Sequence, residues 1–165
     1  MEFEATFEIA APRAEVLAAM GEPTYYEHLA TRVTSIEQPE LLHTELTDGV
    51  LHLSVRYAFS GDLSGPAKMV IDSSKLTWTI NTVLDLATHR AVLDIVPDHY
   101  GDLVVAEAAV TFEERGTATI ESIAGSLEVK IPLFGAAAER AIVDGLLRHL
   151  GTEAQALAEY CAAGS

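Results

Sequence analysis

The chain has 165 residues, of which 49% are hydrophobic, and its 25 acidic and 10 basic residues give a formal net charge of −15. This length and apolar content are typical of one folded domain rather than of a disordered chain, so we expect a single domain spanning residues 1–165. The acidic surface repels nucleic-acid phosphates and anionic lipid head groups, and the few bases are scattered, so we expect no nucleic-acid partner.

The sequence carries no signal for a membrane or an export route. No apolar run approaches the roughly 18 residues that a spanning helix needs. The first residues, Met1–Glu4, lack the basic and apolar regions of a signal peptide. We therefore predict no stable membrane insertion and a cytoplasmic location, with which the single Cys161 agrees because it cannot form an internal disulfide. The oligomeric state stays open.

The N-terminal part predicts one strand followed by two short helices. Residues Glu2–Ile9 alternate between polar and apolar side chains, which is the pattern of a half-buried strand. A first helix begins around Pro12, which is tolerated in a first turn, and ends at Gly21. A second covers Pro23–Thr31 and is too short to be stable without docking on the rest of the protein.

From Val33 to Ile131 the pattern changes to strands. We predict strands over residues 34–43, 50–59, 75–83, 90–97, 103–113 and 117–131. Pro39 interrupts the first of them, Asp48-Gly49 predicts a hairpin, and Gly125 hints at a bulge in the last. Residues 60–66 are expected to be a loop, and 67–72 fit either a helical turn or a strand.

The stretch 132–161 contains the one long helical pattern. Its apolar residues share a broad face: Ile142, Val143, Leu146, Leu147, Leu150, Ala154, Leu157 and Cys161. A helix about 40 Å long, at 1.5 Å per residue, with so wide an apolar face must lie against a large surface. We therefore predict an α+β fold in which an antiparallel sheet of about seven strands wraps around a long C-terminal helix, with two short helices after the first strand.

The segment Gly125–Gly135, with Glu139 after it, resembles a bacterial family of uncharacterised START-like proteins, and Phe3–Pro12 fits the same family. Across the whole chain, the order of elements resembles the helix-grip fold of the START-like (SRPBCC) superfamily, which includes polyketide cyclase/dehydrase families and the birch-pollen allergen. The resemblance implies a cavity between helix and sheet that holds lipids, sterols or polyketides. It implies no shared catalytic residues, and we assign none.

No motif indicates a metal or cofactor. The six histidines are far apart in sequence, and a single cysteine excludes a thiolate zinc cage. Asp98, His99 and Asp102 could bind a metal across a turn, but Asp is also an ordinary turn residue. The sequence has neither a G-x-S-x-G motif nor a glycine-rich phosphate loop, whereas a triad of distant residues stays open. We predict that the protein needs neither metal nor cofactor.

Seven residues are candidates for lining a ligand cavity. They are Tyr57, Trp78 and Leu93 from the strands and Glu139, Ile142, Leu146 and Leu150 from the helix. Tyr57 and Trp78 fit either ordinary core packing or a pocket wall, where the Tyr57 hydroxyl would orient the polar end of a ligand. His149, at the edge of the apolar face, fits a flanking residue better than an acid or base.

Glu139 is an unusual residue because it falls in the middle of the apolar face of the helix. One interpretation places it near the helix N-terminus, where the helix dipole and water stabilise it. The other places it at the cavity mouth, where it recognises a polar or cationic group. Lys130 is an alternative ion-pair partner that would weaken this second interpretation.

Three hypotheses for function follow. The first is non-covalent binding of a small hydrophobic molecule, and the second is a cyclase, aromatase or hydrolase that uses the same cavity, with Glu139, Tyr57 and a histidine converging on one site. The third is an interaction module without a cavity. An empty apolar cavity of about 300 Å³ or more favours binding. Convergent titratable groups favour an enzyme, and a filled interior favours the module.

Overall fold

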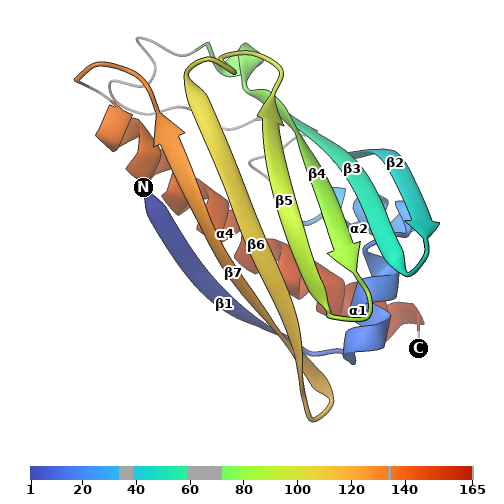
Figure 1. The fold of residues 1–165 in the computed structure, drawn as a ribbon. Coiled ribbons are helices and arrows are strands. Elements are labelled where there is room, and N and C mark those ends of the chain that lie inside the picture. The colour runs from blue at the N-terminus through green and yellow to red at the C-terminus, as the bar shows by residue number, and fades with distance from the viewer. Residues whose placement is uncertain (34–38, 59–71, 134, 165) are drawn as a thin grey trace.

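One antiparallel sheet of seven strands forms the body of the protein (Figure 1). The computed structural model describes residues 1–33, 39–58, 72–133 and 135–164, and every structural statement below concerns these. The strands are β1 (Glu2–Ile9), β2 (Glu40–Thr47), β3 (Val50–Ala58), β4 (Thr77–Asp85), β5 (Arg90–Pro97), β6 (Val104–Arg115) and β7 (Ala118–Val129). Their order in the sheet is β1-β7-β6-β5-β4-β3-β2, so β1 and β2 form its two edges.

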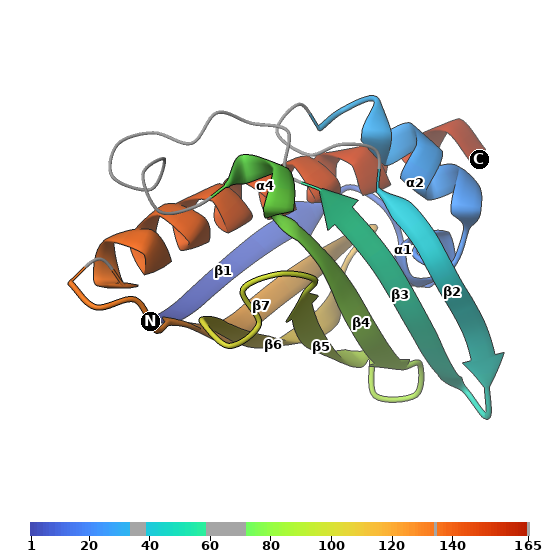
Figure 2. The same cartoon turned by 90° about the horizontal axis from the view of Figure 1, so that it is seen from above.

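The helices lie on the concave side of this curved sheet (Figure 2). The connection from β1 to β2 contains α1 (Arg13–Ala19) and α2 (Pro23–Ala30), and a 3-10 turn at Ser73–Lys75 precedes β4. The long helix α4 (Gly135–Gly164) crosses the sheet and packs mainly against β1, β7, α1 and α2. This arrangement confirms the predicted helix-grip fold class. Among the described helices, none is long and apolar enough to cross a membrane.

The hairpin between β2 and β3 forms where the sequence predicts it. Asp48 and Gly49 both have positive φ, 52° and 80°, as a two-residue turn matching the twist of its strands requires. The described strand before this turn, β2, runs from Glu40 to Thr47, four residues beyond the predicted end at residue 43, whereas the predicted start at residue 34 falls outside the described residues. The predicted loop 60–66, and all of 67–72 except Asp72, lie outside the described residues, as do 34–38.

Gly125 has a different role from the predicted bulge. Its pairing with Phe3 on β1 and Ala108 on β6 continues in unbroken register on both sides. A Cβ on Gly125 would lie 2.6 Å from Cζ of Phe3 and 2.6 Å from the carbonyl oxygen of Glu107. The glycine is therefore needed for close packing. The register irregularity that does occur lies in β2, between Leu41 and His43.

Candidate ligand cavity

A cavity of about 100 Å³ lies between α4 and the concave face of the sheet. Most of its walls are apolar and include Phe3, Leu53, Val55, Ile80, Leu93, Ile95, Val110, Phe112, Ile123, Leu146, Leu150 and Leu157. The volume is below the roughly 300 Å³ of typical ligand pockets. It is closer to the roughly 150 Å³ of an engineered protein cavity that binds benzene. The space therefore suits a molecule of about one six-membered ring.

Four of the seven predicted lining residues surround this cavity. Tyr57 and Leu93 line it from the sheet, and Leu146 and Leu150 line it from α4. Trp78 is not a lining residue; it pairs with Tyr57 across β3 and β4, and the two rings stack at a centroid distance of 5.8 Å and an angle of 14°. It thus supports the wall without being part of it.

Glu139 and Ile142 lie outside the cavity, which corrects their predicted placement. Oε1 of Glu139 accepts a hydrogen bond of 3.0 Å from the backbone N–H of Val129, and Oε2 lies 3.6 Å from the amino group of Met1. The helical wheel puts Glu139 in line with Leu146, but seven residues move it about 10 Å along the axis. Glu139 therefore lies beside the end of β7, before α4 reaches the cavity. Ile142 is 38% exposed to solvent.

One wall of the cavity is polar, and sequence reasoning did not identify most of it. The hydroxyl of Tyr57 donates to Oε1 of Glu153 at 3.2 Å, and Nε2 of His149 lies 3.3 Å from the same oxygen. The Tyr57 and His149 rings meet edge to face at 5.7 Å. Tyr25 and Tyr26 from α2 line the same cavity. Residues from a strand, a short helix and the long helix therefore converge on one place.

Glu121, on β7, adds a second carboxyl to the lining. Burial, reinforced by the negative charge of Glu153, raises the pKa of Glu121 to about 8. Glu121 therefore holds its proton near neutral pH. Burial and then the Glu153 charge likewise raise the pKa of Tyr57 well above its ordinary value.

His149 is the one base in this wall, among the described residues. Burial of the imidazole opposes its protonation, but the charge of Glu153 and the hydrogen bond to it prevail, so the pKa of His149 is raised. The side chain is only 8% exposed, in contrast to the flanking position expected from the sequence. Its Nδ1 has no hydrogen-bond partner within the described part of the chain. A buried polar atom left in this way is costly unless a ligand or water serves it.

Both missed carboxylates had a signal in the sequence. Glu121 lies on the same strand face as Ile123 and Leu127, at the period of two that defines the inner side. Glu153 lies between His149 and Leu157 at spacings of four residues on the inner stripe of α4. A charged residue on an apolar stripe was recognised at Glu139 but not at these two positions.

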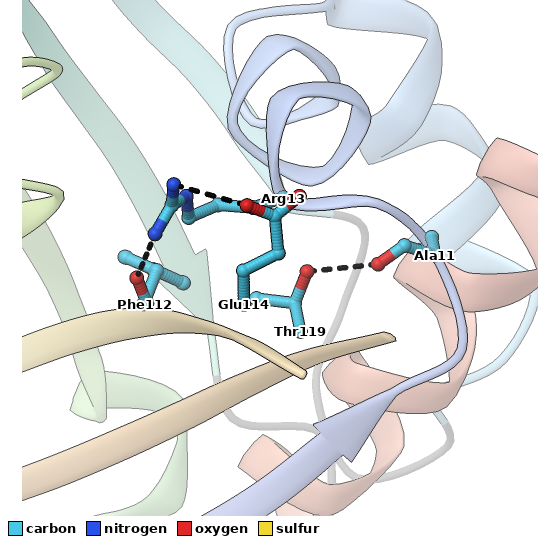
Figure 3. A network of polar contacts seen from close by, with 5 residues as sticks. All are labelled: Ala11, Arg13, Phe112, Glu114 and Thr119. Atoms are coloured by element: carbon cyan, nitrogen blue, oxygen red, sulfur yellow. Dashed lines mark hydrogen bonds and ion pairs between the residues drawn. The ribbon is translucent and has the colours of Figure 1, made fainter. Parts of the chain in front are cut away.

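A larger groove, about 650 Å³ and open to solvent, lies at the other end of the sheet between α1 and the β2–β3 hairpin. Two of its charged lining residues, Arg13 and Glu114, pair with each other (Figure 3). Nη2 of Arg13 lies 3.3 Å from Oε2 of Glu114, and Nη1 donates to the carbonyl of Phe112 at 3.4 Å. Beneath them, the buried Thr119 hydroxyl donates to the carbonyl of Ala11 at 2.8 Å. The cavity under α4, which is less open and contains the unpartnered Nδ1 of His149, is the better candidate site.

The turn at Asp98 shows no metal site. Asp98 accepts hydrogen bonds from Arg56 at 2.7 Å and from Thr77 at 2.6 Å, so its carboxylate is engaged in holding β3, β4 and β5 together. No group of three or more metal-ligating side chains is found within the described ranges.

Comparison with solved structures identifies proteins of the same fold. The protein TTHA0849 from Thermus thermophilus is similar over 100% of this chain and 99% of its own, with a TM-score of 0.70 and 19% identity. The Zhui aromatase/cyclase from Streptomyces sp. R1128 is similar over 98% and 93%, with a TM-score of 0.64 and 16% identity. A norcoclaurine synthase from Thalictrum flavum is similar over 99% and 95%, with a TM-score of 0.62 and 14% identity. At these identities the likeness shows the fold alone.

Sequence comparison adds a family but no characterised relative. The model of a family described as "Protein of unknown function (DUF2505)" matches residues 4–161. No curated protein matches the chain significantly in sequence.

Proposed function

This chain belongs to the DUF2505 family of proteins of unknown function, and we propose that it binds one small, mainly apolar molecule in the cavity between α4 and the sheet. The observation that carries this proposal is a mainly apolar space under α4 with a cluster of polar groups on part of its wall. Such a wall fixes the orientation of a ligand whose other side is held by apolar contact. Tyr57, His149 and Glu153 supply the polar groups, and Leu93, Leu146 and Leu150 are among the apolar lining residues.

The size of the cavity limits the ligand. About 100 Å³ has room for one ring and a short substituent, whereas a long lipid or a multi-ring polyketide requires the walls to move apart. The side of α4 near β3, β4 and β5 borders the cavity rather than packing tightly on those strands, so it is the place where the walls can separate.

The binding proposal is tested with toluene as a one-ring probe. We expect toluene to raise the melting temperature and to shift backbone amide signals of β5 and of α4 around Leu146. Shifts confined to the groove around Arg13, or no shift at millimolar toluene, would contradict the proposal. Native mass spectrometry of the freshly purified protein would then identify a co-purified natural ligand by its mass.

An enzyme is the second candidate, favoured by the convergence of titratable groups. Glu121 with a pKa of about 8 is a proton donor near neutral pH, and Glu153 with His149 can accept a proton in the same cavity. A cyclase-like or hydrolytic reaction would use such a donor and acceptor on one bound ligand. The likeness to an aromatase/cyclase is a likeness of fold, so the support comes from these side chains.

Incubation of the protein with its co-purified compound separates the two candidates. Recovery of the unchanged compound supports binding alone. Conversion that Glu121→Gln abolishes, while the variant still binds toluene, supports the enzyme.

A further inference from the structure

The polar wall of the cavity contains more acid than base. Two carboxyl groups face it, Glu121 from β7 and Glu153 from α4, and no Lys or Arg is among its described lining residues. Glu153 has partners in His149 and Tyr57. Glu121 has no hydrogen bond or ion pair with the described part of the chain, although it sits among buried apolar residues.

A second observation indicates that this wall is incomplete without a ligand. His149 is 8% exposed and lines the cavity, yet its Nδ1 has no hydrogen-bond partner among the described residues. When the imidazole is neutral, Nε2 donates to Glu153 and Nδ1 is left as an acceptor. The wall thus offers two positions, at Glu121 and at Nδ1, to a group that donates hydrogen bonds.

We propose that the cavity selects a one-ring ligand carrying an ammonium group, and that this ammonium takes the place of the proton on Glu121. The inference rests on the proposed binding function and specifies the class of its ligand. No Lys or Arg in the described lining competes with such a cation, and aromatic residues, whose ring faces attract cations, are among the lining: Phe3, Tyr25, Tyr26, Tyr57 and Phe112.

The charges balance before and after binding. In the free cavity Glu121 is neutral, and Nε2 of His149 donates to Glu153. On binding, the O–H bond of Glu121 breaks, its proton leaves to solvent, and the ammonium of the ligand neutralises the resulting carboxylate. The other titratable groups of the wall stay uncharged, because burial, followed by the charge of Glu153, raises the pKa values of Tyr25, Tyr26 and Tyr57.

This exchange makes ammonium binding dependent on pH. With the pKa of Glu121 at about 8, ionised Glu121 is about 1% of the total at pH 6 and roughly three quarters at pH 8.5. If the ammonium binds only the ionised form, its affinity rises about 75-fold between these two values. The affinity of a neutral ligand of the same shape should not depend on pH in this way.

The experiment compares three probes that share one ring and differ in the attached group: benzylamine, benzyl alcohol and benzoate. Isothermal titration calorimetry at pH 6, 7.5 and 8.5, in buffers of different ionisation enthalpy, measures affinity and proton release together. We expect benzylamine to bind most tightly at pH 8.5, with an affinity that rises tens of fold from pH 6 and with proton release at pH 7.5. Benzyl alcohol should bind with little pH dependence, and benzoate most weakly.

Two variants locate the effect. Glu121→Gln should abolish the pH dependence and the preference for benzylamine while benzyl alcohol still binds. Glu113→Gln, which removes an exposed carboxylate from β6, should leave both unchanged. Benzyl alcohol binding equal to or tighter than benzylamine at pH 8.5, or an unaltered preference in Glu121→Gln, would overturn the ammonium inference alone. Failure of all three probes to bind would overturn the proposed function and this inference with it.

Discussion

Replacing Glu121 by Gln should stabilise the protein, and increasingly so as pH rises. Gln has nearly the same shape as Glu but no ionisable proton, so it removes the conflict between a buried position and a negative charge. The ordinary pKa of the carboxyl is 4.5, whereas the pKa of Glu121 in the folded protein is about 8. Below pH 4.5 the carboxyl of Glu121 is protonated in both the folded and the unfolded chain, so its ionisation does not change the free energy of unfolding.

Between pH 4.5 and 8 only the unfolded chain releases the proton, so the wild type loses stability over this window and not outside it. The two pKa values differ by about 3.5, which at 1.36 kcal/mol per pH unit sets an upper bound of roughly 5 kcal/mol, reached above pH 8. At pH 7 the corresponding figure is roughly 3 kcal/mol. The measured gain should be smaller, because Glu121 keeps some accessible surface within the cavity.

Urea unfolding of the wild type, Glu121→Gln and Glu113→Gln at pH 5, 7 and 9 provides the assay. The difference in unfolding free energy between Glu121→Gln and the wild type should increase from pH 5 to pH 9. The raised pKa of His149 affects both proteins, so its contribution largely cancels in the difference. A difference that stays constant across these pH values, or that matches Glu113→Gln, would refute the assignment of Glu121 as a buried, protonated group.

Three further substitutions test the packing. Leu146→Trp should fill the cavity and abolish toluene binding, at a stability cost below the roughly 1–3 kcal/mol of overpacking a dense core, and a wild-type-like affinity would contradict this. Gly125→Ala should destabilise by about 1–3 kcal/mol in urea titration, because its Cβ meets the Phe3 ring and a backbone carbonyl, and an unchanged midpoint would show that both can move aside. Thr119→Val should cost roughly 1–3 kcal/mol by the same measurement, since it leaves the buried carbonyl of Ala11 without its donor; a neutral result would mean that another donor replaces the hydroxyl.

Local patterns predicted the fold because each element has a clear period. The alternation in Glu2–Ile9, the turn residues Asp48 and Gly49 and the wide apolar face of α4 each identify an element without knowledge of the others. Element boundaries were less accurate. The end of β2 was placed four residues early, because Thr44, Glu45 and Thr47 add polar residues that hide how far the pairing with β3 continues.

The candidate site was less predictable, because it depends on position along an element as well as on its faces. Periodicity selected Leu93, Leu146 and Leu150, which line the cavity, but it also selected Glu139, which lies on the same helix face at the end of β7. Glu121 and Glu153 line the same cavity although they are more than 30 residues apart in sequence. Only the three-dimensional arrangement of α4 over β7 indicates that both carboxyls face one space.

The order of the sheet also affects association between copies of the protein. The two edge strands, β1 and β2, are the ones that could extend the sheet with a strand from another molecule. The irregularity between Leu41 and His43 disturbs the pairing surface of β2, which carries Glu40 and Glu45, while β1 carries three glutamates within eight residues. Part of the net charge of −15 is therefore placed where two identical edges would meet, and its repulsion opposes edge-to-edge association.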